Sequence, residues 1–110
     1  MNMRKIELYL PSVEPFIITM PTIEGSSLAS ASWKLKVWAS ECITINKSEA
    51  IRISDEQYKV YVDTGKIGKG VVWMQLLIDM IDVDYASGVR PQTPVYETNY
   101  IVVDPPFKKK

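Results

Sequence analysis

The residues that could carry out catalysis in this chain are few, and they lie apart in the sequence. None of the 110 residues is a histidine, which removes the commonest general base and the commonest transition-metal ligand. One cysteine, Cys42, cannot form an internal disulfide or a cysteine zinc site. Its neighbours Ile43, Thr44 and Ile45 are typical of a strand in which cysteine serves as a small hydrophobic residue. The sequence therefore predicts a protein that is not an enzyme and that has no catalytic residues and no cofactor.

The densest acidic group is Asp79, Asp82 and Asp84. On a strand, Asp82 and Asp84 would point the same way, and the carbonyls of loop 85–90 could complete a calcium site with them. The spacing is not that of an EF-hand, and the favoured interpretation is that these acids end a strand in solvent, with Arg90 as an ion-pair partner. Two carboxylates could also hydrolyse a glycoside, but a chain of this size offers no large aromatic cleft for the sugar.

Trp38 is an aromatic residue whose neighbours suggest ligand binding. It shares a predicted strand face with Lys34 and Lys36, and such a ring could stack on a sugar or a base. The alternative is that Trp38 packs under the lysine stems or against a neighbouring subunit. The glycines at 65, 68 and 70 are not followed by Gly-Lys-Ser/Thr, so they are expected to form the turn of a hairpin rather than a phosphate loop.

The overall composition limits the partners that this chain can have. Thirteen basic and thirteen acidic residues give zero formal charge, so no long-range field attracts nucleic acid or an anionic membrane. No apolar stretch typical of a signal segment follows Arg4 and Lys5, and the apolar run 71–78 is far shorter than the ~20 residues that span a bilayer. We therefore expect a soluble protein made in the cytoplasm, with neither nucleic acid nor membrane as a partner.

Period-two patterns indicate that the elements are strands. Residues 33–40 alternate strictly, with Trp33, Leu35 and Val37 on one face and the lysines and Trp38 on the other. Further strands are predicted at 6–10, 16–20, 43–45, 51–53, 58–63 and 96–103. Residues 71–84 fit a strand better than a helix, although a helical stripe through 74, 77, 78 and 81 remains the alternative. The predicted fold is an all-β antiparallel sandwich of seven to eight strands, covering residues 1–103.

Two parts of the sequence are candidates for contact with a partner. If residues 71–84 form a strand, Trp73, Leu77 and Ile81 line a face that is too long to be covered by this small domain throughout. Trp38 joins this group as a residue that can pack against a neighbouring subunit. After the last strand, residues 104–110 form an extended Pro/Lys tail in which Pro105, Pro106 and Phe107 could lie on a neighbour.

The order of the segments between residues 27 and 103 resembles a group of small immunoglobulin-like domains. The resemblance rests on Ser27-Leu28-Ala29 before strand 33–37, on Gly70 before a long strand, and on Ile81-Asp82-Val83-Asp84-Tyr85 followed by Gly88-Val89-Arg90 and a final strand. These domains belong to virion proteins of tailed phages and prophages, particularly those of Bacteroidetes hosts, and to the N-terminal part of upper-baseplate proteins. In this sequence Ala86-Ser87 stands where that pattern leads one to expect a proline and an acid.

This resemblance implies an immunoglobulin-like sandwich and a structural function. The protein would be a head-fibre, head-decoration, tail or baseplate component, made in the host cytoplasm and located in the virion, with other virion proteins or copies of itself as partners in an oligomer. The competing class is a carbohydrate- or ligand-binding sandwich that uses an exposed tryptophan, Trp38 or Trp73. An accessory domain of a secreted bacterial surface complex is a third class, which the missing signal segment disfavours.

Overall fold

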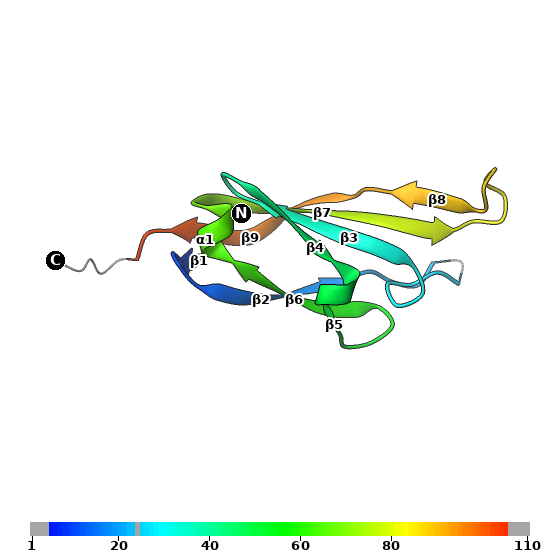
Figure 1. Ribbon diagram of the computed structural model, residues 1–110, viewed down its shortest axis with the longest axis horizontal. Helices are drawn as coiled ribbons and strands as arrows, with labels where there is room; N and C mark the ends of the chain where they lie inside the picture. The colour runs from blue at the N-terminus through cyan, green and yellow to red at the C-terminus, as the bar shows by residue number, and fades with distance from the viewer. Residues whose placement is uncertain (1–4, 24, 106–110) are drawn as a thin grey trace.

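The structure is a computed structural model that describes residues 5–23 and 25–105. In these residues the chain forms nine strands in two sheets, which confirms the predicted all-β sandwich (Figure 1). The predicted seven to eight strands were thus slightly too few. In chain order the elements are β1 (Ile6–Tyr9), β2 (Val13–Thr19), β3 (Ser32–Trp38), β4 (Cys42–Asn46), η1 (Lys47–Glu49), β5 (Ile51–Arg52), β6 (Gln57–Asp63), α1 (Thr64–Ile67), β7 (Gly70–Ile81), β8 (Val89–Gln92) and β9 (Val95–Val103).

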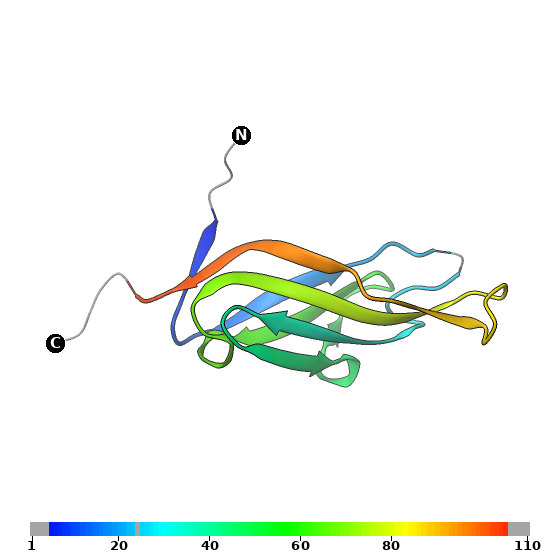
Figure 2. The same cartoon turned by 90° about the horizontal axis from the view of Figure 1, so that it is seen from above.

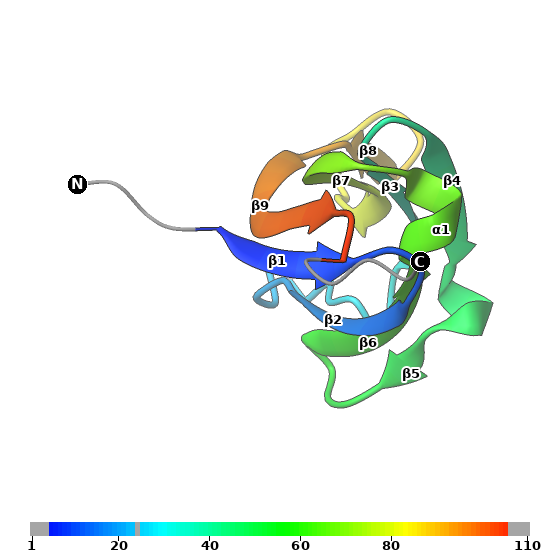
Figure 3. The same cartoon turned by 90° about the vertical axis from the view of Figure 1, so that its left-hand side faces the viewer.

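The two sheets differ in size. The larger has the order β1-β9-β7-β3-β4, with β8 beside the far part of β7, and the smaller has the order β2-β6-β5 (Figure 3). Neighbouring strands are antiparallel except β1 and β9, which run parallel with Ile6 opposite Tyr100. The purely antiparallel prediction is therefore wrong at this edge. The turn at residues 10–12 carries the chain from one sheet to the other, so β1 pairs with the last strand instead of with β2.

The strand order is that of an immunoglobulin-type sandwich. Lettered in chain order from β1 as strand A, the smaller sheet β2-β6-β5 is B-E-D, and β9-β7-β3-β4 is G-F-C-C′. β8 is additional and forms a hairpin with the end of β7. The first strand departs from the usual arrangement, since it lies beside G rather than beside B.

The core lies between the inward faces of the two sheets. The alternation predicted for residues 33–37 is confirmed, because Trp33, Leu35 and Val37 are buried. Val72, Met74, Leu76, Ile78 and Met80 of β7 are buried in the same way, and Val60 and Val62 of β6 face them from the smaller sheet. This strict burial pattern shows that residues 70–81 are strand and excludes the helical alternative.

The connection between β6 and β7 differs from the predicted hairpin. These two strands belong to different sheets, and the one-turn helix α1 carries the chain across the end of the sandwich. Asp63 begins α1 by accepting a hydrogen bond from the Gly65 amide at 2.9 Å, and Gly68 ends it at a φ of 78°. In the described residues, neither helical element has the length and apolar character that crossing a membrane requires.

Two proline-containing segments form edge strands. Pro15 lies inside β2 opposite Tyr61, whereas the prediction began this strand at residue 16. Pro91 lies in β8 opposite Asp79, in a segment that was expected to be loop. A proline lacks the N–H that a central strand needs, but an edge strand can turn that position away from its neighbour. The edge position of β2, which its flanking prolines predicted, is confirmed.

Candidate functional site: the outer face of the larger sheet

The outer face of the larger sheet collects the residues that the sequence singled out. Because successive side chains of a strand point to opposite faces, burial of 72, 74, 76, 78 and 80 leaves Trp73, Leu77 and Ile81 outside. Trp38 reaches the same face from β3, directly opposite Trp73. We call Trp38, Trp73, Leu77 and Ile81 the β7 strip. The structure therefore brings these four of the seven predicted contact residues onto one face.

One end of the β7 strip is a tryptophan pair. The rings of Trp38 and Trp73 stack with centroids 6.5 Å apart and planes 11° apart. Each ring covers part of the other, so both are only partly exposed, as is Leu77, whereas Ile81 keeps 47% of its surface in solvent. The middle of the strip is thus less exposed than its sequence suggested, because neighbouring side chains shield it.

A groove of about 410 Å³ crosses the face beyond the tryptophan pair. Leu77 and Pro91 contribute apolar surface, while Lys34, Asn46, Asp79 and Gln92 contribute polar groups around it. The groove lies where β3 and β8 flank opposite edges of β7, with Ser32 and Pro91 on either side of Asp79. A side chain or a small ligand with mixed polarity fits this lining.

The strip continues onto a hairpin that projects from one end of the sandwich (Figure 2). We call residues 78–92 the arm; it comprises the end of β7, the loop 82–88 and β8. Four apolar side chains of the arm are largely exposed, with Val83 at 88%: Ile81, Val83, Tyr85 and Val89. Val83, Tyr85 and Val89 were not predicted as contact residues, although an apolar residue between two acids, as at Val83, is a signal that could have indicated exposure.

The loop of the arm is held by its own hydrogen bonds. The Asp82 amide donates to the Gly88 carbonyl at 3.0 Å, and the Gly88 amide donates to the Tyr85 carbonyl at 2.9 Å. The Asp82 carboxylate accepts from Arg90 Nε at 2.8 Å and from the Asp84 amide at 3.1 Å. A loop fixed in this way loses little conformational entropy when it contacts a partner.

These contacts bear on the calcium hypothesis. Both carboxylate oxygens of Asp82 already accept hydrogen bonds, and Asp84 is exposed beside it. Within residues 5–23 and 25–105, no three His, Cys, Asp or Glu side chains converge as they would around a metal ion. The predicted pairing of the acidic end with Arg90 is confirmed, and we propose no ion site here.

The Asp82–Arg90 contact makes the arm sensitive to acid. The hydrogen bond from Arg90, followed by that from the Asp84 amide, lowers the pKa of Asp82. A carboxyl whose pKa is lower in the folded state stabilises that state above about pH 4, and this contribution is lost as the pH falls through the lowered pKa. We therefore expect the protection factor of the Gly88 amide, which is the exchange rate of an unstructured amide at the same pH divided by the measured rate, to fall below about pH 4 in NMR hydrogen exchange. Asp82→Asn should remove this pH dependence, and a midpoint above the ordinary aspartate pKa would contradict the assignment.

Outside the strip, the structure offers no obvious chemistry at Cys42. Its side chain is exposed at the start of β4, and its Sγ lies 3.6 Å from the Ile43 carbonyl. The predicted place at the start of a strand is confirmed, and Cys42 points to the outer face opposite Trp38. Pro105 is exposed after the end of β9, while Pro106 and Phe107 lie outside the described residues.

The smaller sheet carries a second exposed apolar face that the sequence reasoning missed. It consists of outward residues of all three strands: Val13, Pro15, Ile17, Ile51 and Tyr61. Lys59 lies within this face with its Nζ 5.5 Å from the Tyr61 ring centroid. The signal was present in the alternation of 13, 15 and 17, but beginning the strand at residue 16 concealed it.

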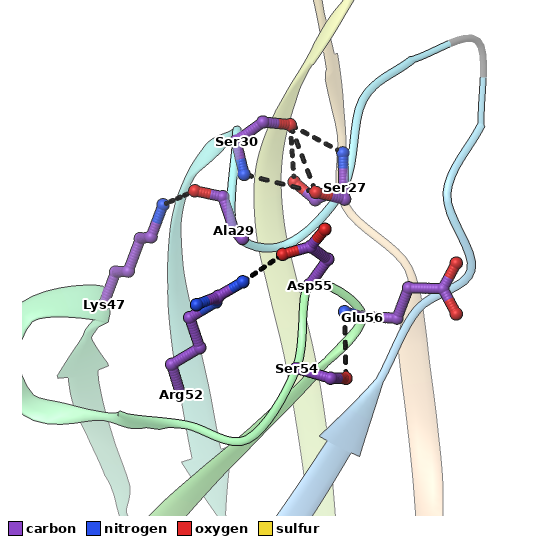
Figure 4. A network of polar contacts seen from close by, with 8 residues as sticks. All are labelled: Ser27, Ala29, Ser30, Lys47, Arg52, Ser54, Asp55 and Glu56. Carbon is purple, nitrogen blue, oxygen red and sulfur yellow. Dashed lines mark hydrogen bonds and ion pairs between the residues drawn. The ribbon is translucent and has the colours of Figure 1, made fainter.

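A polar cluster at the end from which the arm projects is structural (Figure 4). Lys47 Nζ donates to the carbonyls of Ala29 and Ala31 at 2.8 and 2.7 Å, which fixes the turn before β3. Arg52 pairs with Asp55, and Ser27 and Ser30 hydrogen-bond to each other. The Thr22 amide donates to Glu56 at 2.8 Å and lowers its pKa. The Lys47 and Glu56 contacts join segments that are distant in the sequence, whereas the Arg52–Asp55 and Ser27–Ser30 contacts each fix a single turn.

Comparison with known proteins adds no relative: no family model, curated protein or solved structure matches this chain.

Proposed function

We propose that this chain is a non-enzymatic structural protein that joins proteins into a larger assembly through the outer face of its larger sheet. The observation that supports this most is the β7 strip, which runs along the sheet and onto a projecting, internally hydrogen-bonded arm. Apolar side chains that are exposed or partly exposed along one face are typical of protein contact sites. The arm adds Val83, Tyr85 and Val89 to that surface.

The resemblance of residues 27–103 to virion domains suggests which assembly this is. We propose the virion of a tailed phage or prophage, with the chain as a head-fibre, head-decoration, tail or baseplate component that is made in the bacterial cytoplasm. The immunoglobulin-type strand order agrees with the domains that the resemblance names. Its partners would be other virion proteins or copies of itself, and the zero formal charge disfavours nucleic acid and anionic membranes.

A matched pair of variants tests the assembly function. Ile81→Asp places a charge at the exposed end of the β7 strip, and Ile17→Asp does the same at a similarly exposed isoleucine on the other sheet. Both should fold, because neither side chain is buried. In particles purified from cells that express each variant, we expect mass spectrometry to find at least about tenfold less of the Ile81 variant than of wild type, because an interface disfavours an unpaired charge. The Ile17 variant should be incorporated like wild type.

Other outcomes would change the conclusion. Absence of the wild-type chain from purified particles would overturn the virion proposal. Loss of the Ile17 variant alone would keep an assembly function but move the contact to the smaller sheet. Catalytic turnover that is lost with Asp82→Asn or Asp84→Asn, with folding intact, would show that the chain is an enzyme.

A carbohydrate-binding function is the second candidate, and the stacked tryptophans beside a mixed-polarity groove favour it. A ring in this pair could stack on a sugar while Lys34, Asn46 or Gln92 bonds to its hydroxyl groups. Glycan-array binding that disappears with Trp38→Ala, together with normal incorporation of the Ile81 variant, would favour this function over assembly.

A further inference from the structure

The outer face of the larger sheet is arranged in cross-strand rows that are two residues apart along β7. From the tryptophan pair to the arm, the five rows are Trp38-Trp73-Glu97, Lys36-Gln75-Val95, Lys34-Leu77, Ser32-Asp79-Pro91 and Ile81-Val89. The Leu77 row is the middle one. On one side of it come the basic row of Lys36 and then the aromatic row of Trp73. On the other side come the acidic row of Asp79 and then the aliphatic row of Ile81.

This order makes the face complementary to itself when it is reversed. A two-fold axis along the Leu77 row, in the plane of the interface and perpendicular to the strands, would place each row of one copy on its counterpart in the other. The aliphatic row of Ile81 would then lie on the tryptophan pair, and the acidic row of Asp79 would lie on the row of Lys36. Such a contact uses the same patch on both copies, as closed dimers do.

We propose that the partner covering this face is a second copy of the chain, in an antiparallel two-fold dimer with the arm of each copy lying over the tryptophan pair of the other. The inference rests on the proposed assembly function and names its partner. At each end Ile81 of one copy lies on the tryptophan pair of the other, and Val89 lies over Glu97. Asp79 lies over Gln75, one strand away from Lys36, so two symmetric Asp79–Lys36 contacts join the copies between the ends. The two Lys34 side chains lie near the axis, each flanked by an Asp79 of the other copy.

The charges of the face support this pairing. Asp79 is exposed, Lys36 is partly exposed, and in the described part of the chain neither makes an ion pair. Glu97, at the edge of the aromatic row, is neutralised by Lys5 at 2.9 Å. In the dimer each Asp79 would lie beside a cation of the other copy. Complementary charges of this kind fix the register of two surfaces more than they raise affinity.

The size of the face sets the expected strength. Residues 73–81 span roughly 26 Å at a rise of about 3.3 Å per residue, and three to five strands cover about 14–24 Å at a spacing of ~4.8 Å. The resulting footprint of roughly 400–600 Å² is smaller than the ~800 Å² per partner of a standard interface. We therefore expect a weak dimer, with a dissociation constant on the order of 10–100 μM.

A charge exchange tests the two-fold arrangement. Sedimentation velocity of the wild-type chain should show a monomer–dimer equilibrium at concentrations from about 5 to about 500 μM, which lie on either side of the expected dissociation constant. Asp79→Lys and Lys36→Asp should each raise the dissociation constant at least about tenfold, because both symmetric contacts become like-charged. The double variant should restore dimerisation, since the two charges have only exchanged places. Lys66→Asp, on the exposed turn α1, should dimerise like wild type.

Three results would overturn the dimer. They are a wild-type chain that stays monomeric at the highest concentration, single variants that dimerise normally, and a double variant that remains as weak as the single ones. If particle incorporation depends on Ile81 but the purified chain stays monomeric, the dimer is rejected and the proposed assembly function is kept. Failure of both measurements would reject both proposals.

Discussion

Replacing Trp33 with alanine is expected to lower the free energy of unfolding by about 3–5 kcal/mol, the usual cost of removing a large buried aromatic side chain. Trp33 is 6% exposed on β3, and its ring packs edge-on against Tyr58 at a centroid distance of 5.2 Å. Its Nε1 also donates to the Leu28 carbonyl at 2.9 Å. The variant therefore loses apolar burial, an aromatic contact and a buried hydrogen bond together. Urea titration followed by far-UV circular dichroism measures the loss.

Trp38→Ala is the matched control, because it removes the same side chain from the opposite face of the same strand. Trp38 is partly exposed, and among the described residues its ring stacks on Trp73 alone, so a loss of about 1 kcal/mol is expected. Equal losses for the two variants would mean that the sheet does not separate a core face from an outer face, and the proposed contact surface would then fail as well.

The two tryptophans also show what local sequence can predict. They are five residues apart on one strand, and strict alternation assigns them to opposite faces without any knowledge of the neighbouring strands. The same reasoning correctly assigned the inward residues of β7. It even identified the β7 strip, because a long strand with apolar residues on both faces needs cover on both.

Pairing between distant segments could not be predicted in this way. No local pattern in the sequence indicates that β1 lies parallel to β9, because a strand of four residues has the same alternation whether it pairs with β9 or with β2. The glycines at 65, 68 and 70 are equally compatible with a hairpin and with a turn that crosses between sheets. The arm was missed because Arg90 and Pro91 are typical of a loop, whereas β8 tolerates the proline at an edge.

The candidate site shows the same limit. Sequence placed Trp73 and Leu77 on an outer face, but how much solvent they meet depends on Trp38 and on the groove around Leu77. The order of the rows, on which the dimer rests, exists only once β3, β7 and β8 are aligned. Lys36 and Asp79 are 43 positions apart in the chain, and the register puts them one row on either side of Leu77.

Gly68→Ala is expected to lower the free energy of unfolding by about 2–4 kcal/mol, through backbone strain and a lost hydrogen bond. Gly68 ends α1 at φ 78° and ψ −171°, a backbone conformation that residues other than glycine rarely adopt. A Cβ at this position would also lie 2.0 Å from Ser40 Oγ. The Ser40 hydroxyl donates to the Ile67 carbonyl at 3.2 Å. Moving this hydroxyl therefore breaks a contact between the β6–β7 connection and the turn between β3 and β4. Thermal and urea unfolding measure the loss.

Two further variants separate the strain from the clash. Ser40→Ala removes the oxygen in the way and leaves Ser40's Cβ position at an ordinary 3.4 Å, so Gly68→Ala should cost about 1 kcal/mol less in that background. Gly25→Ala, at a φ of 80° with no other described residue within 4 Å of the added Cβ, should show strain alone, at about 1 kcal/mol. If Gly68→Ala lowered the free energy of unfolding no more than Gly25→Ala does, α1 would not be held against the turn between β3 and β4. The start of β7, and with it the position of the β7 strip relative to Trp38, would then be free to shift.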